Sequence, residues 1–121
     1  RMSVVTFDTR VRQDERNSAF YDSVREGLLG YAGVKGRCSI RCDSFRYRGK
    51  LIAKIAIGGR TLKLYLDAKV PEGIKASNVD KGGIDAYSEV PLLLPLKSGV
   101  AVRKAIAVID SMMRDKGIVK A

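Results

Sequence analysis

The residue types that most often carry catalysis are scarce in this chain of 121 residues, which contains no histidine and only two cysteines. Histidine is the commonest general base, the usual partner of a serine or cysteine nucleophile, and a frequent metal ligand. The closest carboxylates, Asp14 and Glu15, stand where a helix is expected to begin, and the helix dipole favours negative charge there. The sequence also lacks the glycine and lysine spacing of a phosphate-binding loop. These features predict a protein that is not an enzyme.

The two cysteines predict neither a disulfide nor a metal site. Cys38 and Cys42 are expected in one strand, where a rise of about 3.3 Å per residue separates them by about 13 Å. This distance exceeds the limit of roughly 7 Å for a disulfide. Without histidine, a zinc site of four ligands within one chain would need carboxylates to complete it. We therefore expect no metal and no cofactor, and we expect both thiols to be small core residues in a reducing compartment.

The hydropathy of the chain predicts a cytoplasmic location. No run approaches the roughly 20 apolar residues that a membrane span needs. The first ten residues, RMSVVTFDTR, lack the apolar region of a signal peptide. We accordingly expect no contact with a membrane.

Basic residues are concentrated in residues 34–63, which contain nine lysines and arginines but only one acidic residue, Asp43. The whole chain has a formal net charge of +10. Basic and apolar residues alternate in this segment, as is typical of strands with one polar face. A basic sheet with aromatic residues is characteristic of proteins that bind single-stranded nucleic acid. The candidate anion-binding residues are Arg37, Arg41, Lys54, Arg60 and Lys63, and the candidates for base stacking are Phe45 and Tyr65.

The same charges have a second interpretation that needs no ligand. Lysines and arginines on an exposed face keep a sheet hydrated and discourage aggregation between sheet edges. The sequence leaves both interpretations open.

The elements around the basic segment are predicted in the order strand, helix, three strands, long loop, strand and helix. Residues 3–12 alternate like a half-buried strand. Asp14 is expected to cap the first helix, and the second is expected to run from Ser98 to Gly117. Apolar residues recur at helical spacing at Phe20, Val24, Leu28 and Tyr31, and again at Val102, Ile106, Ile109 and Met113. We predict a single α+β domain over residues 1–121, with an antiparallel sheet of about five strands and two helices packed on one face.

The hairpin around Gly58 and Gly59 is expected to have these glycines in its turn. Lys54 would then lie opposite Lys63, a like-charge pair that is mildly destabilising unless it is neutralised or holds an anion. A slip of one residue would bury the lysines, which fixes the two faces. The expected apolar face contains Ala53, Ile55, Ile57, Leu62, Leu64 and Leu66.

The preceding hairpin has two plausible registers. A two-residue turn at Arg48 and Gly49 places Asp43 and Phe45 on the polar face, where Asp43 would neutralise Lys54. A three-residue turn with a glycine bulge instead buries Phe45 and Tyr47 and exposes Ile40, Cys42 and Arg46. We favour the first register, with a bulge near Ser44 that reconciles it with buried aromatic residues.

Residues 67–89 form a predicted loop that is longer than an ordinary connection, as lids and binding loops often are. The following residues, 90–97, contain Pro91 and Pro95, which indicate an edge strand because proline cannot donate to the strand ladder. An edge strand beside a long loop is a plausible docking site for another chain.

Several segments resemble an uncharacterised domain family of mainly Gram-positive bacteria over roughly residues 20–110. They are LLGYAGVKGR, CDSFRYRGKLIAK, GGRTLKLYL, AYSEVPLLLPLKS and AVRKAIAVID. The chain is also more distantly similar to the YdhG-like and YjbR-like small α/β domains. Family members occur as repeated or appended modules, so the resemblance implies binding or scaffolding rather than catalysis. The YdhG-like domains include a proposed iron chaperone, but iron delivery would require an acidic, oxygen-rich surface that this basic chain lacks.

The sequence therefore predicts a non-enzymatic binding module whose basic sheet face meets an anionic partner, with nucleic acid as the favoured partner. The main alternative is a module for protein interaction or for homodimer formation through the edge strand and the long loop. A third class is an enzyme that uses Lys54 or Tyr65 as acid or base, but no further catalytic residues support it.

Overall fold

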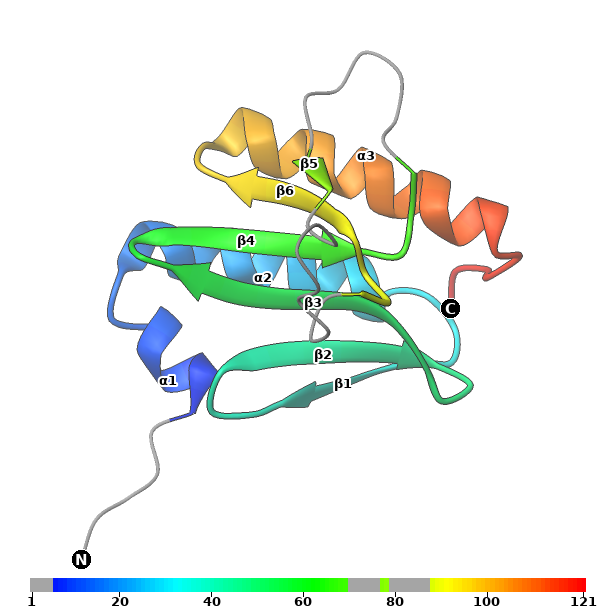
Figure 1. The fold of residues 1–121 in the computed structure, drawn as a ribbon, viewed down its shortest axis with the longest axis horizontal. Coiled ribbons are helices and arrows are strands. Elements are labelled where there is room, and N and C mark those ends of the chain that lie inside the picture. The colour runs from blue at the N-terminus through cyan, green and yellow to red at the C-terminus, as the bar shows by residue number, and fades with distance from the viewer. Residues whose placement is uncertain (1–5, 70–76, 79–87) are drawn as a thin grey trace, which may run out of the picture.

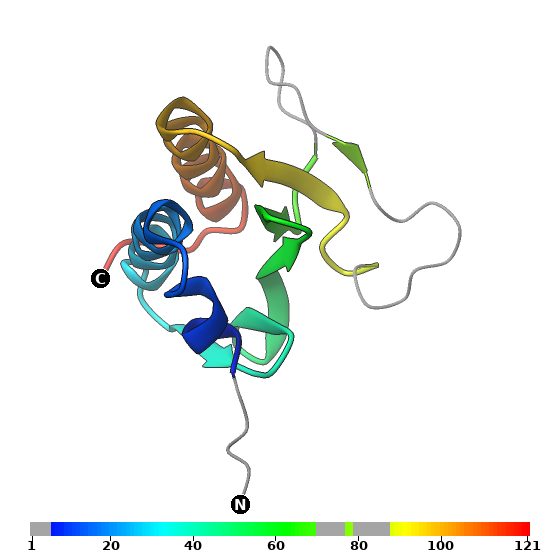
Figure 2. The same cartoon turned by 90° about the vertical axis from the view of Figure 1, so that its left-hand side faces the viewer.

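The computed structural model describes residues 6–69, 77–78 and 88–121, and within them the chain forms three helices and a six-stranded sheet. All strand pairs are antiparallel, in the order β1-β2-β3-β4-β6-β5. Helices α2 and α3 lie side by side on one face of the sheet (Figures 1 and 2). The predicted α+β class is confirmed. The elements are α1 (Phe7–Val11), α2 (Glu15–Leu29), β1 (Val34–Cys38), β2 (Cys42–Tyr47), β3 (Lys50–Gly58), β4 (Thr61–Leu66), β5 (Ser77–Asn78), β6 (Leu92–Leu96) and α3 (Gly99–Asp115).

The strand predicted over residues 3–12 is wrong where the structure describes it, because α1 occupies most of this segment. The side chain of Thr6 accepts a hydrogen bond from the backbone N–H of Thr9 and caps the helix. Phe7 and Val11 are four residues apart and both fully buried, so they lie on one face of a helix. Thr9, which a strand would place on the same face, is exposed, so only the four-residue spacing of Phe7 and Val11 fits both a helical turn and a strand.

The two long helices begin as predicted. The carboxylate of Asp14 accepts a hydrogen bond of 3.0 Å from the N–H of Asn17 at the start of α2. The hydroxyl of Ser98 accepts one of 3.1 Å from the N–H of Ala101 at the start of α3. Gly117 follows α3 with a φ of 73°, a left-handed conformation that suits glycine. The buried faces of α2 and α3 pack against the sheet, and together they form the main core of the protein.

The β3–β4 hairpin has the predicted faces but a different register. Lys54 lies opposite Tyr65, and Lys63 lies opposite Ala56, so the predicted pairing of Lys54 with Lys63 is wrong. The turn is formed by Gly59 and Arg60, and Gly59 has a φ of 64°, which fits a type II′ turn with glycine first. A shift of two residues keeps each side chain on its face. The predicted apolar face is therefore confirmed, and five of its six residues are buried: Ala53, Ile55, Leu62, Leu64 and Leu66.

The β2–β3 hairpin has the predicted two-residue turn at Arg48 and Gly49, whose φ values are 51° and 81°. A bulge follows between Phe45 and Arg46, close to the predicted position. The bulge reverses the faces of the rest of β2, because one extra residue of β3 shifts the alternation. Phe45 and Asp43 therefore face the helices and are fully buried, so their predicted place on the polar face is wrong.

Strand β6 contains Pro95, as predicted for an edge strand, but it is not at the edge of the sheet. It pairs with β4 on one side, and its Leu92 and Leu93 pair with β5 on the other. Pro95 lies beyond the pairing with β5, so its missing N–H breaks no ladder bond on that side. The edge strands are β1 and β5. Most of the predicted 67–89 loop lies outside the described residues.

The sheet face opposite α2 and α3, here called the outer face, is partly apolar. A small cluster on it contains Leu51, Ala56, Tyr65 and Val90, all buried, with Cys42 and Leu93 packed against them. This cluster lies over β3, β4 and β6, where Lys54 and Lys63 share the outer face with it, and the other basic residues of the outer face lie on β1 and β2. None of the described helices is long and apolar enough to span a membrane.

Candidate functional site

A cation-lined groove lies over β1, β2 and the turn that follows β2. Its volume is about 720 Å³, and its charged lining residues are Lys35, Arg37, Arg46 and Arg48. The remaining lining residues, Gly33, Gly36, Ser44 and Gly49, are small. No carboxylate lines it. These eight residues define the β1–β2 groove.

Strand pairing explains why the cations gather there. Lys35 is the partner of Arg46, and Arg37 is the partner of Ser44. Directly opposed residues of an antiparallel pair project from the same face, so these side chains share the outer face. Gly36 lies between the two basic residues of β1 and faces the other way, where the ring of Phe45 fills the space. Alternation along β1 thus puts both of its cations on one side.

The groove cations are not neutralised by carboxylates of the described chain. In the described residues, the cations that form ion pairs are Arg12, Arg25, Lys50 and Lys116. None of the four groove cations is among them. Arg48 instead lies over the ring of Tyr47, with its guanidinium carbon 5.3 Å from the ring centre. Lys35, Arg37, Arg46 and Arg48 are all exposed. An anion entering the groove would therefore meet four cations and no competing negative charge.

The predicted anion-binding residues do not form one cluster. Arg37 lies in the groove, and Lys54 continues its row across the sheet, because Ser44 pairs with both Arg37 and Lys54. Lys63 also lies on the outer face, opposite Ala56 and Pro95, and is half-buried. Arg41 is exposed in the turn between β1 and β2, and Arg60 is exposed in the turn between β3 and β4. On the outer face, Arg37 and Lys54 thus share a row, Lys63 is a diagonal neighbour of Lys54, and Arg41 and Arg60 lie apart in turns.

Both predicted stacking residues are buried, which corrects that part of the predicted site. Phe45 is fully buried between the sheet and the helices. Tyr65 is buried in the apolar cluster of the outer face and is 7% exposed. Neither ring is presented to solvent as a platform for a base. A ligand of the β1–β2 groove would therefore be held by charge and hydrogen bonds rather than by these rings.

Three groove residues were not among the predicted site residues: Lys35, Arg46 and Arg48. Their signal was present in the sequence, since all three belong to the basic segment, and Lys35 and Arg37 are two residues apart on one strand. Only the register with a three-residue turn, which we did not favour, predicted that Arg46 is exposed. The bulge after Phe45 decides its face, and sequence alternation alone does not locate a bulge.

A second group of polar residues is buried at the other side of β2. Asp43 is fully buried and faces α2, where Tyr21 donates a hydrogen bond of 2.6 Å to Oδ2 and the Nε of Arg25 lies 3.2 Å from the same atom. The other oxygen, Oδ1, has no hydrogen-bond partner in the described part of the chain. Burial, together with the hydrogen bond to Asp43, raises the pKa of the Tyr21 hydroxyl. Asp43 is therefore paired with Arg25. The prediction that it neutralises Lys54 is wrong.

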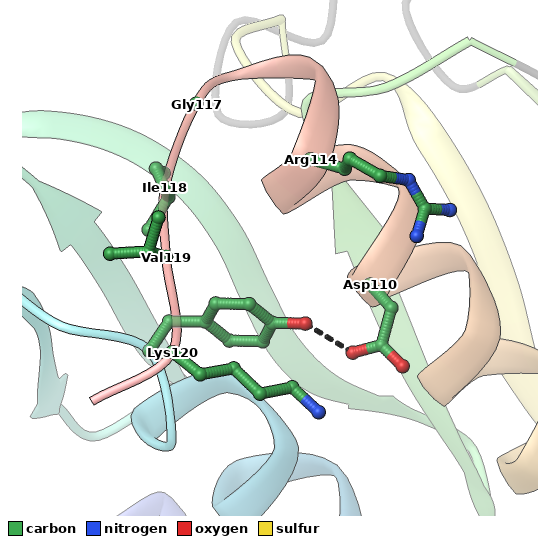
Figure 3. Close-up of a pocket in the computed structure, with 7 residues that line it drawn as sticks. Asp110, Arg114, Gly117, Ile118, Val119 and Lys120 are labelled. Atoms are coloured by element: carbon green, nitrogen blue, oxygen red, sulfur yellow. Dashed lines mark hydrogen bonds between the residues drawn. The ribbon is translucent and has the colours of Figure 1, made fainter.

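A pocket of about 380 Å³ lies beside the end of α3, lined by Tyr31, Asp110, Arg114 and the residues 117–120 (Figure 3). The hydroxyl of Tyr31 donates a hydrogen bond to Asp110. Burial, with this hydrogen bond, raises the pKa of Tyr31 to about 12. The tyrosine thus keeps its proton at neutral pH. The C-terminal residues also pair with the segment that follows α2, since Lys120 and Tyr31 form a β-bridge.

The cysteines are free, as predicted, but for a different reason. Cys38 ends β1 and Cys42 begins β2, so they do not share one strand. Cys38 is paired with Asp43, whose side chain faces the helices, whereas Cys42 packs against the cluster on the outer face. Cys38 is exposed, so its expected place in the core is wrong. Within the described residues, no group of three or more cysteine, aspartate or glutamate side chains could hold a metal ion.

Comparisons of the chain with protein-family models, with curated proteins and with solved structures find no match. The resemblance to the Gram-positive domain family therefore stays a prediction.

Proposed function

We propose that the protein is a non-enzymatic binding module whose β1–β2 groove binds the phosphate backbone of nucleic acid. The observation that supports this proposal is the groove itself, which has four exposed cations and no carboxylate in its lining. Contacts of lysine and arginine with phosphates supply most of the affinity in sequence-independent binding, through release of counterions. A cytoplasmic location, where nucleic acid and reduced thiols occur together, fits this proposal.

The burial of Phe45 and Tyr65 defines the expected mode of binding. Many proteins that bind single-stranded nucleic acid on a β-sheet gain affinity from base stacking on aromatic rings. Without these two rings, the groove would contact phosphates and would discriminate weakly between base sequences. We therefore expect similar affinities for oligonucleotides of different sequence.

The test is fluorescence anisotropy of labelled single-stranded and duplex oligonucleotides, titrated with the protein at several salt concentrations. Four engaged cations give an expected slope of about −3 to −4 for the logarithm of the binding constant against the logarithm of the salt concentration with duplex DNA. Binding that is absent at low salt would contradict the proposal. A salt-independent dimer in size-exclusion chromatography, in the same samples, would favour the alternative of a protein-interaction module.

A pair of charge-reversed variants separates the groove from the general positive charge of the chain. In the first variant, Arg37→Glu is combined with Arg46→Glu, and we expect affinity to fall by about tenfold or more, equivalent to about 1.4 kcal/mol. In the matched control, Arg103→Glu is combined with Lys104→Glu on the exposed side of α3, which changes the net charge by the same amount. Equal losses in both variants would mean that the groove is not the binding site.

A further inference from the structure

A second group of cations lies at the opposite end of the sheet from the turn that borders the β1–β2 groove. Arg60 is in the β3–β4 turn, Arg16 is in the first turn of α2, and Lys97 links β6 to α3. They line a cavity of about 150 Å³ together with Asn17, Thr61 and Leu96, here called the Arg60 pocket. The nine residues of β3 separate its two turns by about 30 Å. The Arg60 pocket is therefore distinct from the groove.

Hydrogen bonds between the elements hold the Arg60 pocket in shape. The side-chain amide of Asn17 donates a bond of 3.1 Å to the carbonyl oxygen of Arg60, which ties α2 to the β3–β4 turn. The guanidinium of Arg16 donates to the carbonyl oxygen of Lys97, which ties α2 to the segment before α3. Arg16 also lies over the ring of Phe20, 5.4 Å from its centre. Three separate elements are thus fixed around one small cavity.

The electrostatics of the Arg60 pocket favour an anion. No carboxylate lines it, and in the described part of the chain Arg16, Arg60 and Lys97 form no ion pair. Bringing three positive charges around one cavity is unfavourable unless negative charge or solvent compensates them. Asn17 and Thr61 add side chains that can donate hydrogen bonds. Figure 1 shows α2 and α3 beginning at this same end of the sheet, where the Asp14 carboxylate caps α2 and the Ser98 hydroxyl caps α3.

The volume of the cavity limits the size of the ligand. Water occupies about 30 Å³ per molecule in the liquid, so 150 Å³ corresponds to about five waters. This space is below the roughly 300 Å³ at which pockets for larger organic ligands begin. The cavity has room for one tetrahedral oxyanion beside Arg16, Arg60 and Lys97, but not for a nucleoside.

We propose that the Arg60 pocket binds one phosphate group, independently of the β1–β2 groove. Arg16 and Arg60 offer guanidinium groups, whose planar donor geometry suits phosphate oxygens, and Lys97 offers a point charge. The phosphate group can be inorganic phosphate or the terminal phosphomonoester of a nucleic-acid strand. These two sources share the same chemistry at the site, and the experiment below distinguishes them.

The first measurement is an NMR titration of the ¹⁵N-labelled protein with sodium phosphate, compared with sodium chloride at equal ionic strength. We expect saturable shifts that only phosphate causes, centred on the backbone amides of Arg16, Thr61 and Lys97. Combining Arg60→Gln with Lys97→Gln should weaken phosphate binding by about tenfold or more, because two charged hydrogen bonds are lost. Combining Arg103→Gln with Lys104→Gln on the exposed side of α3 is the matched control and should leave phosphate binding unchanged. The proposal is overturned by the absence of saturable binding, or by equal binding in the Arg60→Gln/Lys97→Gln protein and the wild type.

The second measurement identifies the source of the phosphate with 5′-phosphorylated and 5′-hydroxyl oligonucleotides of one sequence. Tighter binding of the phosphorylated strand, lost when Arg60→Gln is combined with Lys97→Gln, supports the terminal phosphate of nucleic acid. Equal binding of both strands, with inorganic phosphate still bound, supports free phosphate as the ligand. If no oligonucleotide binds at all, the proposal for the groove fails, while the phosphate titration still decides the case of the Arg60 pocket.

Discussion

The hydroxyl of Tyr21 donates a hydrogen bond of 2.6 Å to Asp43, a carboxylate that is fully buried beneath α2. The same oxygen of Asp43 is 3.2 Å from the Nε of Arg25, whose side chain is partly exposed. A buried carboxylate is stable only when charge and hydrogen bonds compensate its lost hydration. Because Asp43 is on β2 and both partners are on α2, this compensation also ties the helix to the β1–β2 hairpin that carries the groove.

Tyr21→Phe should therefore destabilise the protein. The substitution keeps the ring, which packs edge-on against Phe7, but removes a hydrogen bond to a buried charge. We expect the free energy of unfolding to fall by about 1 to 3 kcal/mol, measured by urea denaturation. Combining Tyr21→Phe with Asp43→Asn tests the cause, since the two effects should be non-additive if the residues are coupled. Strictly additive losses would show that the hydrogen bond does not matter for stability.

Stability should also fall in alkaline solution because of Tyr31. Its pKa rises from the ordinary 10.0 to about 12 in the folded chain, through burial and the hydrogen bond to Asp110. Between these pH values the unfolded state has lost the proton while the folded state still holds it, so the unfolded state binds fewer protons and stability declines as pH rises. The contribution of the Tyr31 proton to the free energy of unfolding is complete below pH 10 and is lost by about pH 12.

The measurement for this prediction is the free energy of unfolding of the wild type and of Tyr31→Phe across the same pH range. Tyr21, whose pKa is also raised, remains in both proteins and adds the same decline to each. The wild type should lose stability more steeply than Tyr31→Phe above pH 10. Parallel curves for the two proteins would exclude a role of Tyr31 in this decline.

Leu64→Ala should be among the most damaging core substitutions. Leu64 is fully buried on β4, opposite Ile55 of β3 and Leu94 of β6. Removal of its side chain leaves a cavity in the main core, for which we expect a loss of about 2 to 5 kcal/mol. Lys63→Ala, on the other face of the same strand, is the control and should cost much less. Thermal melts in which Leu64→Ala resembles the wild type would mean that the assigned faces of β4 are inverted.

The faces of β3 and β4 could be predicted from the sequence because a side-chain period of two constrains them strongly. Any register that keeps Lys54 and Lys63 out of the core gives the same faces. The exact pairing could not be predicted, because a shift of two residues satisfies the same alternation. Whether Gly58 and Gly59, or Gly59 and Arg60, form the turn is a choice between two short turns of similar cost.

The candidate site was harder to predict than the fold because it depends on the faces of single residues. The bulge between Phe45 and Arg46 moves Phe45 and Asp43 into the core and leaves Arg46 on the outer face. Sequence alternation within β2 fits either arrangement. Arg16 and Lys97 were missed because they come from α2 and the segment before α3, and only the folded chain brings them near Arg60. Charge density along the sequence locates a basic segment but not the contacts made across it.

Arg48→Asn should separate stability from binding in the β1–β2 groove. Arg48 has a φ of 51°, a left-handed conformation that costs most residues about 1 to 2 kcal/mol and that asparagine adopts more readily. Asparagine before Gly49 also matches the preferred sequence of a type I′ turn. The free energy of unfolding should therefore rise, by up to about 1 kcal/mol, while the affinity for oligonucleotides falls because one groove cation is lost.

Urea denaturation and fluorescence anisotropy on the same Arg48→Asn preparation measure the two effects. Gly49→Ala is the control for backbone strain, since Gly49 has a φ of 81° and carries no charge. It should lower stability while leaving the slope of binding against salt unchanged. Arg48→Asn should instead reduce the magnitude of that slope by about one. An unchanged slope in Arg48→Asn would show that Arg48 contacts no phosphate, and its strained position would then have no explanation in binding.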